Sequence, residues 1–132
     1  MLMGYEKLRV VKAIKQLIKV VELYTRHVAK DNRGQWRDAK MALYSCFGNL
    51  IRAAEVWGTQ EKNKYFTAFL DEFAVFRGMM QVYTETRIIS TKKASEIATY
   101  TADIGKQVSD WRREIVRDSA PPRPGGGSEQ EE

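Results

Sequence analysis

The chain has 132 residues, which is enough for one domain with a single hydrophobic core and too few for two. Hydrophobic residues make up 43% and charged residues 30%, the balance of a globular chain rather than a disordered one. No apolar run approaches the ~18 residues of a membrane span, and the first residues lack the pattern of a signal peptide. A single cysteine, Cys46, cannot form an internal disulfide and suits a reducing compartment. We therefore expect a cytoplasmic protein that does not bind membranes.

The formal net charge of +5 is unevenly distributed along the chain. Residues 1–40 hold ten Lys or Arg against four Asp or Glu, whereas residues 41–89 hold five of each kind. A basic surplus concentrated in one part of a chain predicts a surface that binds a polyanion. The alternative is a solvated lysine-rich face that only aids solubility.

The first half of the chain predicts two long helices. The first spans about residues 5–30 and ends at the turn-forming residues 31–34. Its apolar residues recur every three to seven positions on one face, as a core-facing helix requires: Val10, Ile14, Leu17, Val21 and Val28. The second spans about residues 36–57 and ends at Gly58, because glycine is favoured just after a helix C-terminus. Its predicted core face consists of Trp36, Leu43, Phe47, Leu50, Ile51 and Ala54, with Cys46 as a small hydrophobe on the flank beside Ala42, Ala53 and Trp57.

The second half predicts two more helices. Thr59 can cap a third at residues 59–87, and Ser90 can cap a fourth at residues 90–117. The apolar stripe of the third is largely aromatic: Phe66, Phe69, Leu70, Phe73, Phe76, Met80 and Ile88. The fourth helix has a similar stripe of Ile97, Ile104, Val108, Trp111 and Ile115. One flank of it carries small residues that would let another helix approach closely: Ala94, Ala98, Thr101 and Gly105.

Short connections between long helices force neighbouring helices to be antiparallel. We therefore predict an all-α fold, an up-down-up-down antiparallel four-helix bundle, over residues 1–118. Residues 119–132 are rich in proline, glycine and glutamate and contain no large apolar residue. This composition predicts a disordered acidic tail.

The third helix is also apolar on a second face. Four small or apolar residues line up there: Ala68, Val75, Met79 and Val82. A helix that is apolar on two faces is usually covered on both, and four helices leave none to cover this one. We therefore expect an oligomer interface. Arg77 falls inside the main apolar stripe, so it needs either an intrachain partner such as Glu72 or Asp103, or a partner across an interface.

The first helix places several cations opposite its core face. Together with the cations that follow it in sequence, they form what we call the basic ridge: Lys12, Lys15, Lys19, Arg26, Lys30, Arg33 and Arg37. Such a row predicts salt-dependent binding of RNA or DNA phosphates. Tyr5, Leu8 and Leu23 point the same way, which suggests a protein contact or base stacking on the same face. The alternative is an amphipathic helix with a lysine-rich wet side.

Residues that could carry out catalysis are scarce. One cysteine and one histidine cannot make a zinc site, and a di-iron bundle would need Glu-x-x-His pairs that the chain lacks. The run Gly125–Gly127 lies in the tail without a strand before it or a helix after it, so it is not a phosphate-binding loop. We therefore expect no enzyme activity, no metal site and no cofactor.

Two segments resemble a known family. Residues 70–77 read LDEFAVFR, and Ile104-Gly105-Lys106 is followed by Trp111, six residues after the glycine. Their order and spacing resemble the accessory variability determinant proteins of diversity-generating retroelements, within a wider group of bundles that includes the ribosomal intervening-sequence proteins. The resemblance covers about residues 5–115.

The resemblance implies a barrel-shaped homopentamer that binds a retroelement reverse transcriptase and nucleic acid, either template RNA or cDNA. Such a protein supports mutagenic reverse transcription and is not itself an enzyme. Arg77 matches a family arginine implicated in contacting the reverse transcriptase, and Gln81 stands where the family often has a second basic residue. Within the wider group, the alternative is a bundle with a structural or unknown interaction role and no specific nucleic-acid function.

Overall fold

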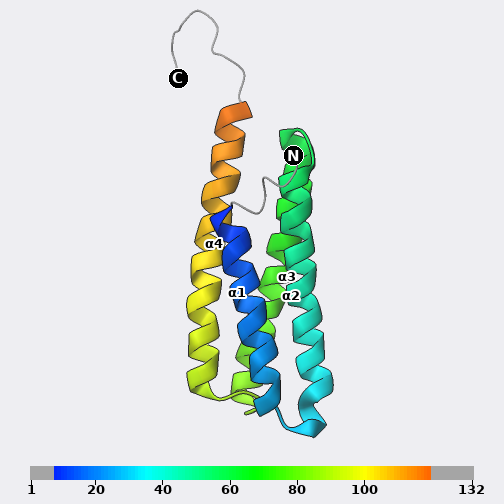
Figure 1. Ribbon diagram of the computed structural model, residues 1–132, viewed down its shortest axis with the longest axis vertical. Coiled ribbons are helices and arrows are strands. Elements are labelled where there is room, and N and C mark those ends of the chain that lie inside the picture. Colours follow the sequence, from blue (N-terminus) through cyan, green and yellow to red (C-terminus); the bar gives the residue numbers. More distant parts are fainter. Residues whose placement is uncertain (1–7, 120–132) are drawn as a thin grey trace, which may run out of the picture.

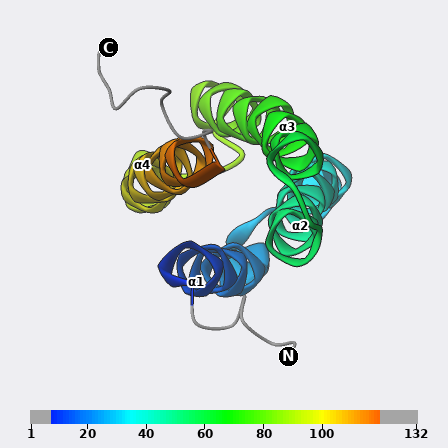
Figure 2. The same ribbon diagram turned by 90° about the horizontal axis from the view of Figure 1, so that it is seen from above.

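The protein is a bundle of four long helices, as the computed structural model of residues 8–119 shows (Figure 1). The helices are α1 (Arg9–Tyr24), α2 (Arg33–Glu55), α3 (Thr59–Glu85) and α4 (Thr91–Ser119). Seen from above, they form a ring in which each helix lies beside the next one in sequence, and α1 closes against α4 (Figure 2). The described residues contain no strand. The predicted all-α four-helix architecture is therefore confirmed. The predicted tail lies outside the described residues, apart from Ser119 at the end of α4.

One hydrophobic core runs along the bundle. The predicted core residues of the first helix are all buried: Val10, Ile14, Leu17, Val21 and Val28. The four phenylalanines of the α3 stripe are buried as well, and the rings of Phe69 and Phe73 stack with centroids 4.9 Å apart. Trp111 of α4 is half-buried and meets Phe66 edge to face at 4.8 Å. The predicted apolar faces of the first and third helices are therefore buried, with two exceptions on the third. Leu70 is only half-buried, and Ile88 is half-buried beyond the end of α3, where Ile89 enters the core instead.

The first helix ends earlier than predicted. α1 stops at Tyr24, and two short 3-10 turns, Thr25–His27 and Lys30–Asn32, lead into α2. Between them Val28 takes an extended backbone conformation, which carries its side chain into the core. The buried Trp36 secures this corner, because its indole Nε1 donates a hydrogen bond to Thr25 Oγ1 at 3.0 Å. The early helix end thus comes from a contact with α2, and the predicted start at Tyr5 lies outside the described residues.

The core face of α2 is rotated relative to the prediction. Three residues assigned to the flank are buried: Ala42, Cys46 and Ala53. Phe47, Ile51 and Ala54, which the periodicity assigns to the core, are only half-buried. Small side chains on α2 leave room for the large aromatic side chains of α3, and close packing favours that pairing. Cys46 behaves as the predicted small hydrophobe, and its burial raises the pKa of its thiol to about 12.

The connections between helices depend on local backbone geometry. Gly58 has a φ of +88° and, rather than Thr59, is the N-cap of α3. Trp57 beside it lies beyond the end of α2 and is 91% exposed. Ser90 caps α4 as predicted, since its Oγ accepts a hydrogen bond from the Lys93 N–H at 3.2 Å.

The turn after α3 holds an arginine in a conformation that favours glycine. Arg87 has a φ of 64°. Its N–H bonds to the Thr84 carbonyl at 3.2 Å, and the Ile88 N–H bonds to the Tyr83 carbonyl at 2.8 Å. These two bonds define a Schellman motif, in which the residue at the position of Arg87 is usually glycine.

The contact between α1 and α4 closes the ring. The Tyr24 hydroxyl of α1 donates a hydrogen bond to the Glu96 carboxylate of α4, and the Lys93 ammonium lies 5.6 Å from the centre of the Tyr24 ring. The bond to Glu96 raises the pKa of Tyr24 to about 12. Polar groups therefore reinforce the apolar contact along this seam.

Candidate nucleic-acid and partner-binding surfaces

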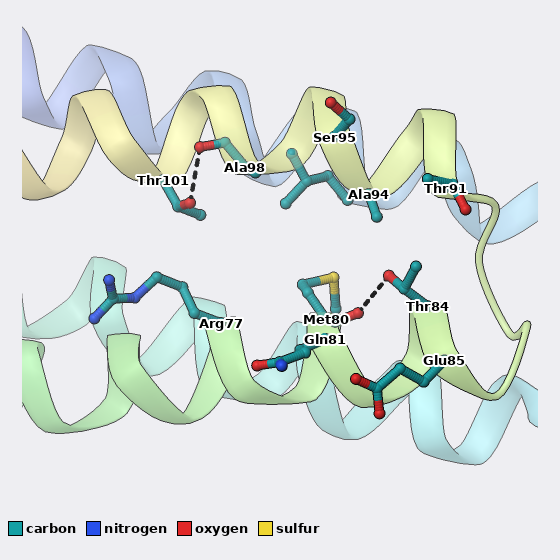
Figure 3. A pocket seen from close by; sticks show the side chains of 11 residues that line it. Arg77, Met80, Gln81, Thr84, Glu85, Thr91, Ala94, Ser95, Ala98 and Thr101 are labelled. Atoms are coloured by element: carbon teal, nitrogen blue, oxygen red, sulfur yellow. Dashed lines mark hydrogen bonds between the residues drawn. The ribbon is translucent and has the colours of Figure 1, made fainter.

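A groove of about 430 Å³ runs between the C-terminal half of α3 and the N-terminal half of α4 (Figure 3). Its lining includes the apolar side chains of Met80 and Ile97, and the α4 side is formed mainly by small residues: Ala94, Ser95, Ala98 and Thr101. The hydroxyls of Thr84 and Thr101 bond to carbonyls of their own helices. Small residues on this flank of α4 predict that another helix can approach it closely, and within the bundle part of the space between α3 and α4 is open beside them.

Arg77 and Gln81, the two residues expected to contact a partner, both line this groove. The Arg77 side chain is exposed rather than buried in the apolar stripe. Its guanidinium carbon lies 5.4 Å from the centre of the Phe73 ring, a cation–π arrangement. Among the described residues, neither Glu72 nor Asp103 forms an ion pair with it. The long side chain starts near the stripe but carries its charge out to the solvent, so the groove has a cation at its edge.

The second apolar face of α3 is only partly exposed. Val75 and Val82 are 48% and 52% exposed. Ala68 and Met79 are half-buried, and Met79 packs against the edge of the core. The four residues therefore do not form one continuous outer surface, although Val75 and Val82 do present apolar groups to the solvent.

The lysines of the basic ridge lie together on the outer side of α1. Lys12, Lys15 and Lys19 are all exposed, and spacings of three and four residues separate them by ~4.5 and ~6 Å along the helix axis. Within residues 8–119 none of the three forms an ion pair. Arg26 and Lys30 are exposed too, but they lie in the 3-10 turns. The straight row of cations therefore ends with α1, and Arg26 and Lys30 continue the positive surface around the turn.

The turn between α1 and α2 contains a second concentration of positive charge. A cavity of about 320 Å³ there is lined by Thr25, Arg33, Gly34, Trp36, Arg37 and Lys40. Arg33 is held partly in place by a hydrogen bond from its Nε to the Val28 carbonyl at 3.3 Å. The first turn of α2 contains no acidic residue, so the positive end of the helix dipole adds to these cations. The structure thus brings Arg33 and Arg37 together at the end of the ridge.

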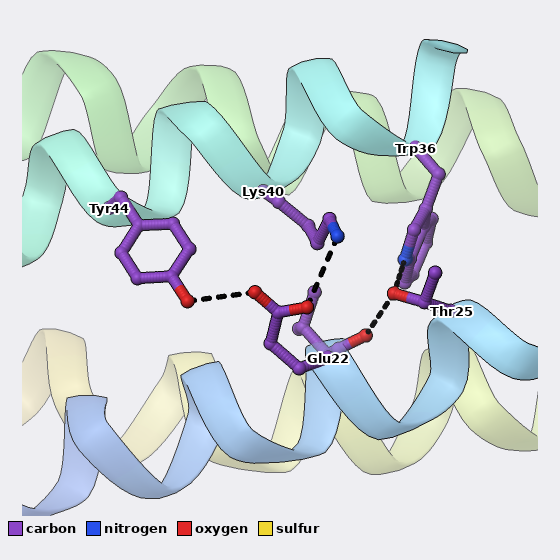
Figure 4. A network of polar contacts seen from close by, with 6 residues as sticks. Glu22, Thr25, Trp36, Lys40 and Tyr44 are labelled. Carbon is purple, nitrogen blue, oxygen red and sulfur yellow. Dashed lines mark hydrogen bonds and ion pairs between the residues drawn. The ribbon is translucent and has the colours of Figure 1, made fainter. Parts of the chain in front are cut away.

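A polar cluster that the sequence did not reveal joins α1 to α2 beside this cavity (Figure 4). Glu22 accepts a hydrogen bond from the Tyr44 hydroxyl at 2.7 Å and pairs with the Lys40 ammonium at 3.1 Å. The bond from Tyr44, followed by the contact with Lys40, holds the pKa of Glu22 below its ordinary value despite partial burial. The same bond raises the pKa of Tyr44. Because Glu22 is the only carboxylate of α1, this pairing offsets the one negative charge on that helix.

The described residues show neither a metal site nor a membrane-spanning helix. No group of three or more His, Cys, Asp or Glu side chains within residues 8–119 could hold a metal ion. No described helix combines the length and the apolar character that crossing a bilayer requires. Comparison with known proteins finds no matching family model and no matching curated protein. The resemblance to accessory variability determinant proteins therefore rests on residues 70–77, residues 104–106 and Trp111.

Proposed function

We propose that this protein is a non-enzymatic accessory subunit of a retroelement reverse transcriptase, and that it binds template RNA or cDNA during mutagenic reverse transcription. The observation that carries the nucleic-acid part is the row of Lys12, Lys15 and Lys19, which are exposed and make no ion pair among the described residues. Unpaired cations in a row can each meet a phosphate without first breaking an internal contact. The remaining ridge cations extend the positive surface around the turn into α2.

The test compares two variants with the same change in net charge. One replaces Lys12, Lys15 and Lys19 with glutamate, and the control replaces Lys64, Lys92 and Lys106, which are exposed on α3 and α4. RNA affinity is measured by fluorescence anisotropy between about 50 and 200 mM salt. The ridge variant should lose RNA binding. The control variant should keep most of its RNA affinity, and that affinity should still fall steeply as the salt concentration rises. Equal binding by both variants would show that the ridge is not the nucleic-acid site.

We further propose that the groove between α3 and α4 receives a helix of the reverse transcriptase. The groove extends on α3 from Arg77 to Glu85, which is ~12 Å or about two helical turns. An apolar groove of this length suits the apolar residues of an amphipathic helix. Arg77 and Glu85 lie at opposite ends, so the docked helix should carry an acidic group near Arg77 and a basic group near Glu85.

Filling the groove tests this docking site. Ala98→Trp places an indole among the residues that line the groove, whereas Thr99→Trp adds the same group to an exposed position that faces away from the groove on the same helix. We expect co-purification with any reverse transcriptase encoded beside this gene to be lost in Ala98→Trp and kept in Thr99→Trp. Capture of the polymerase by both variants would place its contact elsewhere on the bundle.

We also propose that the protein assembles into a homopentamer, with the outer side of α3 at the subunit interface. The exposed apolar groups of Val75 and Val82 support this placement. Light scattering should give five times the chain mass, and Val82→Lys should lower it because a charge at the interface opposes assembly. A monomer at all concentrations would rule out the assembly.

A further inference from the structure

Tyr44 is an exposed aromatic residue beside the basic ridge. It is 41% exposed on α2, and Met41, one turn before it, is 62% exposed. Single exposed apolar side chains are common on protein surfaces, but Met41 and Tyr44 lie one turn apart and together form a small apolar patch beside the cations. The lysines alone therefore do not account for the character of this face.

The ring of Tyr44 is held in a fixed place. Its hydroxyl donates a hydrogen bond to one oxygen of the Glu22 carboxylate at 2.7 Å. The Lys40 ammonium pairs with the other oxygen of the same carboxylate at 3.1 Å (Figure 4). A hydrogen bond to an ionised acceptor is among the stronger ones. This bond thus favours one position of the ring before anything binds, which lowers the conformational entropy lost when a ligand stacks on the ring.

Cations flank this ring on both helices. On α1, Lys19 and Lys15 lie about one and two turns before Glu22. On α2, Arg37 lies about two turns before Tyr44 and lines the basic cavity at the turn. The one carboxylate of α1 is already engaged by Tyr44 and Lys40, so little uncompensated negative charge remains there to repel a phosphate.

We infer that the face formed by α1 and α2 binds single-stranded nucleic acid, with a base stacked on Tyr44 and the neighbouring phosphates on Lys15, Lys19 and Arg37. This inference rests on the proposed nucleic-acid function and narrows its ligand to the single-stranded form. Every base has an aromatic face that can stack on a tyrosine once it is free of its partner strand. A duplex keeps its base faces stacked inside, so it can use the cations but not the ring.

The experiment measures the affinity of the full chain for a fluorescent RNA of about 16 nucleotides and for the same RNA annealed to its complement. Tyr44→Leu removes the ring, and Tyr44→Phe is the matched control that keeps the ring but loses the hydroxyl. We expect single-strand affinity to fall roughly 5- to 150-fold in Tyr44→Leu and by a clearly smaller factor in Tyr44→Phe, which keeps the stacking ring but loses the bond that orders it. Duplex affinity should be nearly the same in all three proteins.

The outcomes separate this inference from the function on which it rests. If the wild-type protein binds neither RNA, the nucleic-acid function fails. If it binds the single strand and Tyr44→Leu binds equally well, the stacking site is overturned and the function stands. Loss of polymerase capture with unchanged RNA binding in Tyr44→Leu would make the face a protein contact and would also overturn the inference.

A second measurement does not depend on the variant folding. The wild-type protein is irradiated with a single-stranded RNA that contains 5-iodouridine, and the cross-linked peptide is identified by mass spectrometry. The cross-link should map to Tyr44, because a stacked iodinated base lies directly against the ring. A cross-link confined to other aromatic residues would contradict the proposal.

Discussion

Replacing Arg77 with alanine separates a docking role of this side chain from a structural one. The variant removes the guanidinium that lies 5.4 Å from the centre of the Phe73 ring. A cation–π contact at an exposed site contributes about 0.5–1 kcal/mol, and alanine returns a few tenths through its higher helix propensity. The free energy of unfolding should therefore fall by less than about 1 kcal/mol. For a domain of this size, that corresponds to a decrease in Tm of no more than about 6 °C.

Urea unfolding followed by circular dichroism gives the change in stability, and co-purification gives the change in polymerase binding. We expect Arg77→Ala to keep the fold and lose the polymerase. Arg52→Ala, an exposed arginine on α2, is the control for the loss of one positive charge and should retain both properties. A loss of more than about 3 kcal/mol in Arg77→Ala would refute the reasoning, because a cost of that size indicates a buried ionic partner left unpaired.

Three further predictions concern the bundle itself. Arg87→Gly should raise the free energy of unfolding by about 0.5–1 kcal/mol because it relieves the left-handed backbone strain, whereas Arg87→Ala should not; equal urea midpoints for the two variants would contradict this. Cys46 should not react with a thiol reagent in the native protein at neutral pH and should react fully in guanidinium chloride, so fast native labelling would show that the thiol is accessible. The folded-state pKa of Glu22 is lowered, so its carboxylate stabilises the fold above its ordinary pKa of 4.5, and this contribution is lost as the pH falls through the lowered value. The wild type should therefore lose its advantage over Glu22→Gln in urea unfolding on acidification, and a constant difference from neutral to acid pH would disprove the contribution.

Helical periodicity predicted which residues of a helix face the core, wherever that helix packs against a single core. The stripe from Val10 to Val21 and the aromatic stripe of α3 depend only on which residues share a face, and that follows from the helix repeat. The cap at Ser90 was predictable for a similar reason, since its hydrogen bond reaches only three residues along the chain.

The remaining features depend on distances between helices, which periodicity does not contain. Val28 continues the helical spacing of Val21, yet the chain leaves the helix between them to reach the core beside Trp36. Small residues on α4 fit either a closely packed helix or an open groove, and only the separation of α3 from α4 decides which occurs. The pairing of Glu22 with Tyr44 spans 22 residues and exists only once α1 and α2 are placed side by side.

The closure of α1 against α4 also bears on how the protein folds. The other neighbouring helices are joined by short connections, so their contacts are local and should form quickly. The hydrogen bond from Tyr24 to Glu96 joins residues 72 positions apart, and closing so long a loop costs more chain entropy than forming a helical hairpin. We therefore expect a nucleus around α2 and α3, with the α1–α4 seam closing late. Mutations at Tyr24 should then speed unfolding far more than they slow folding.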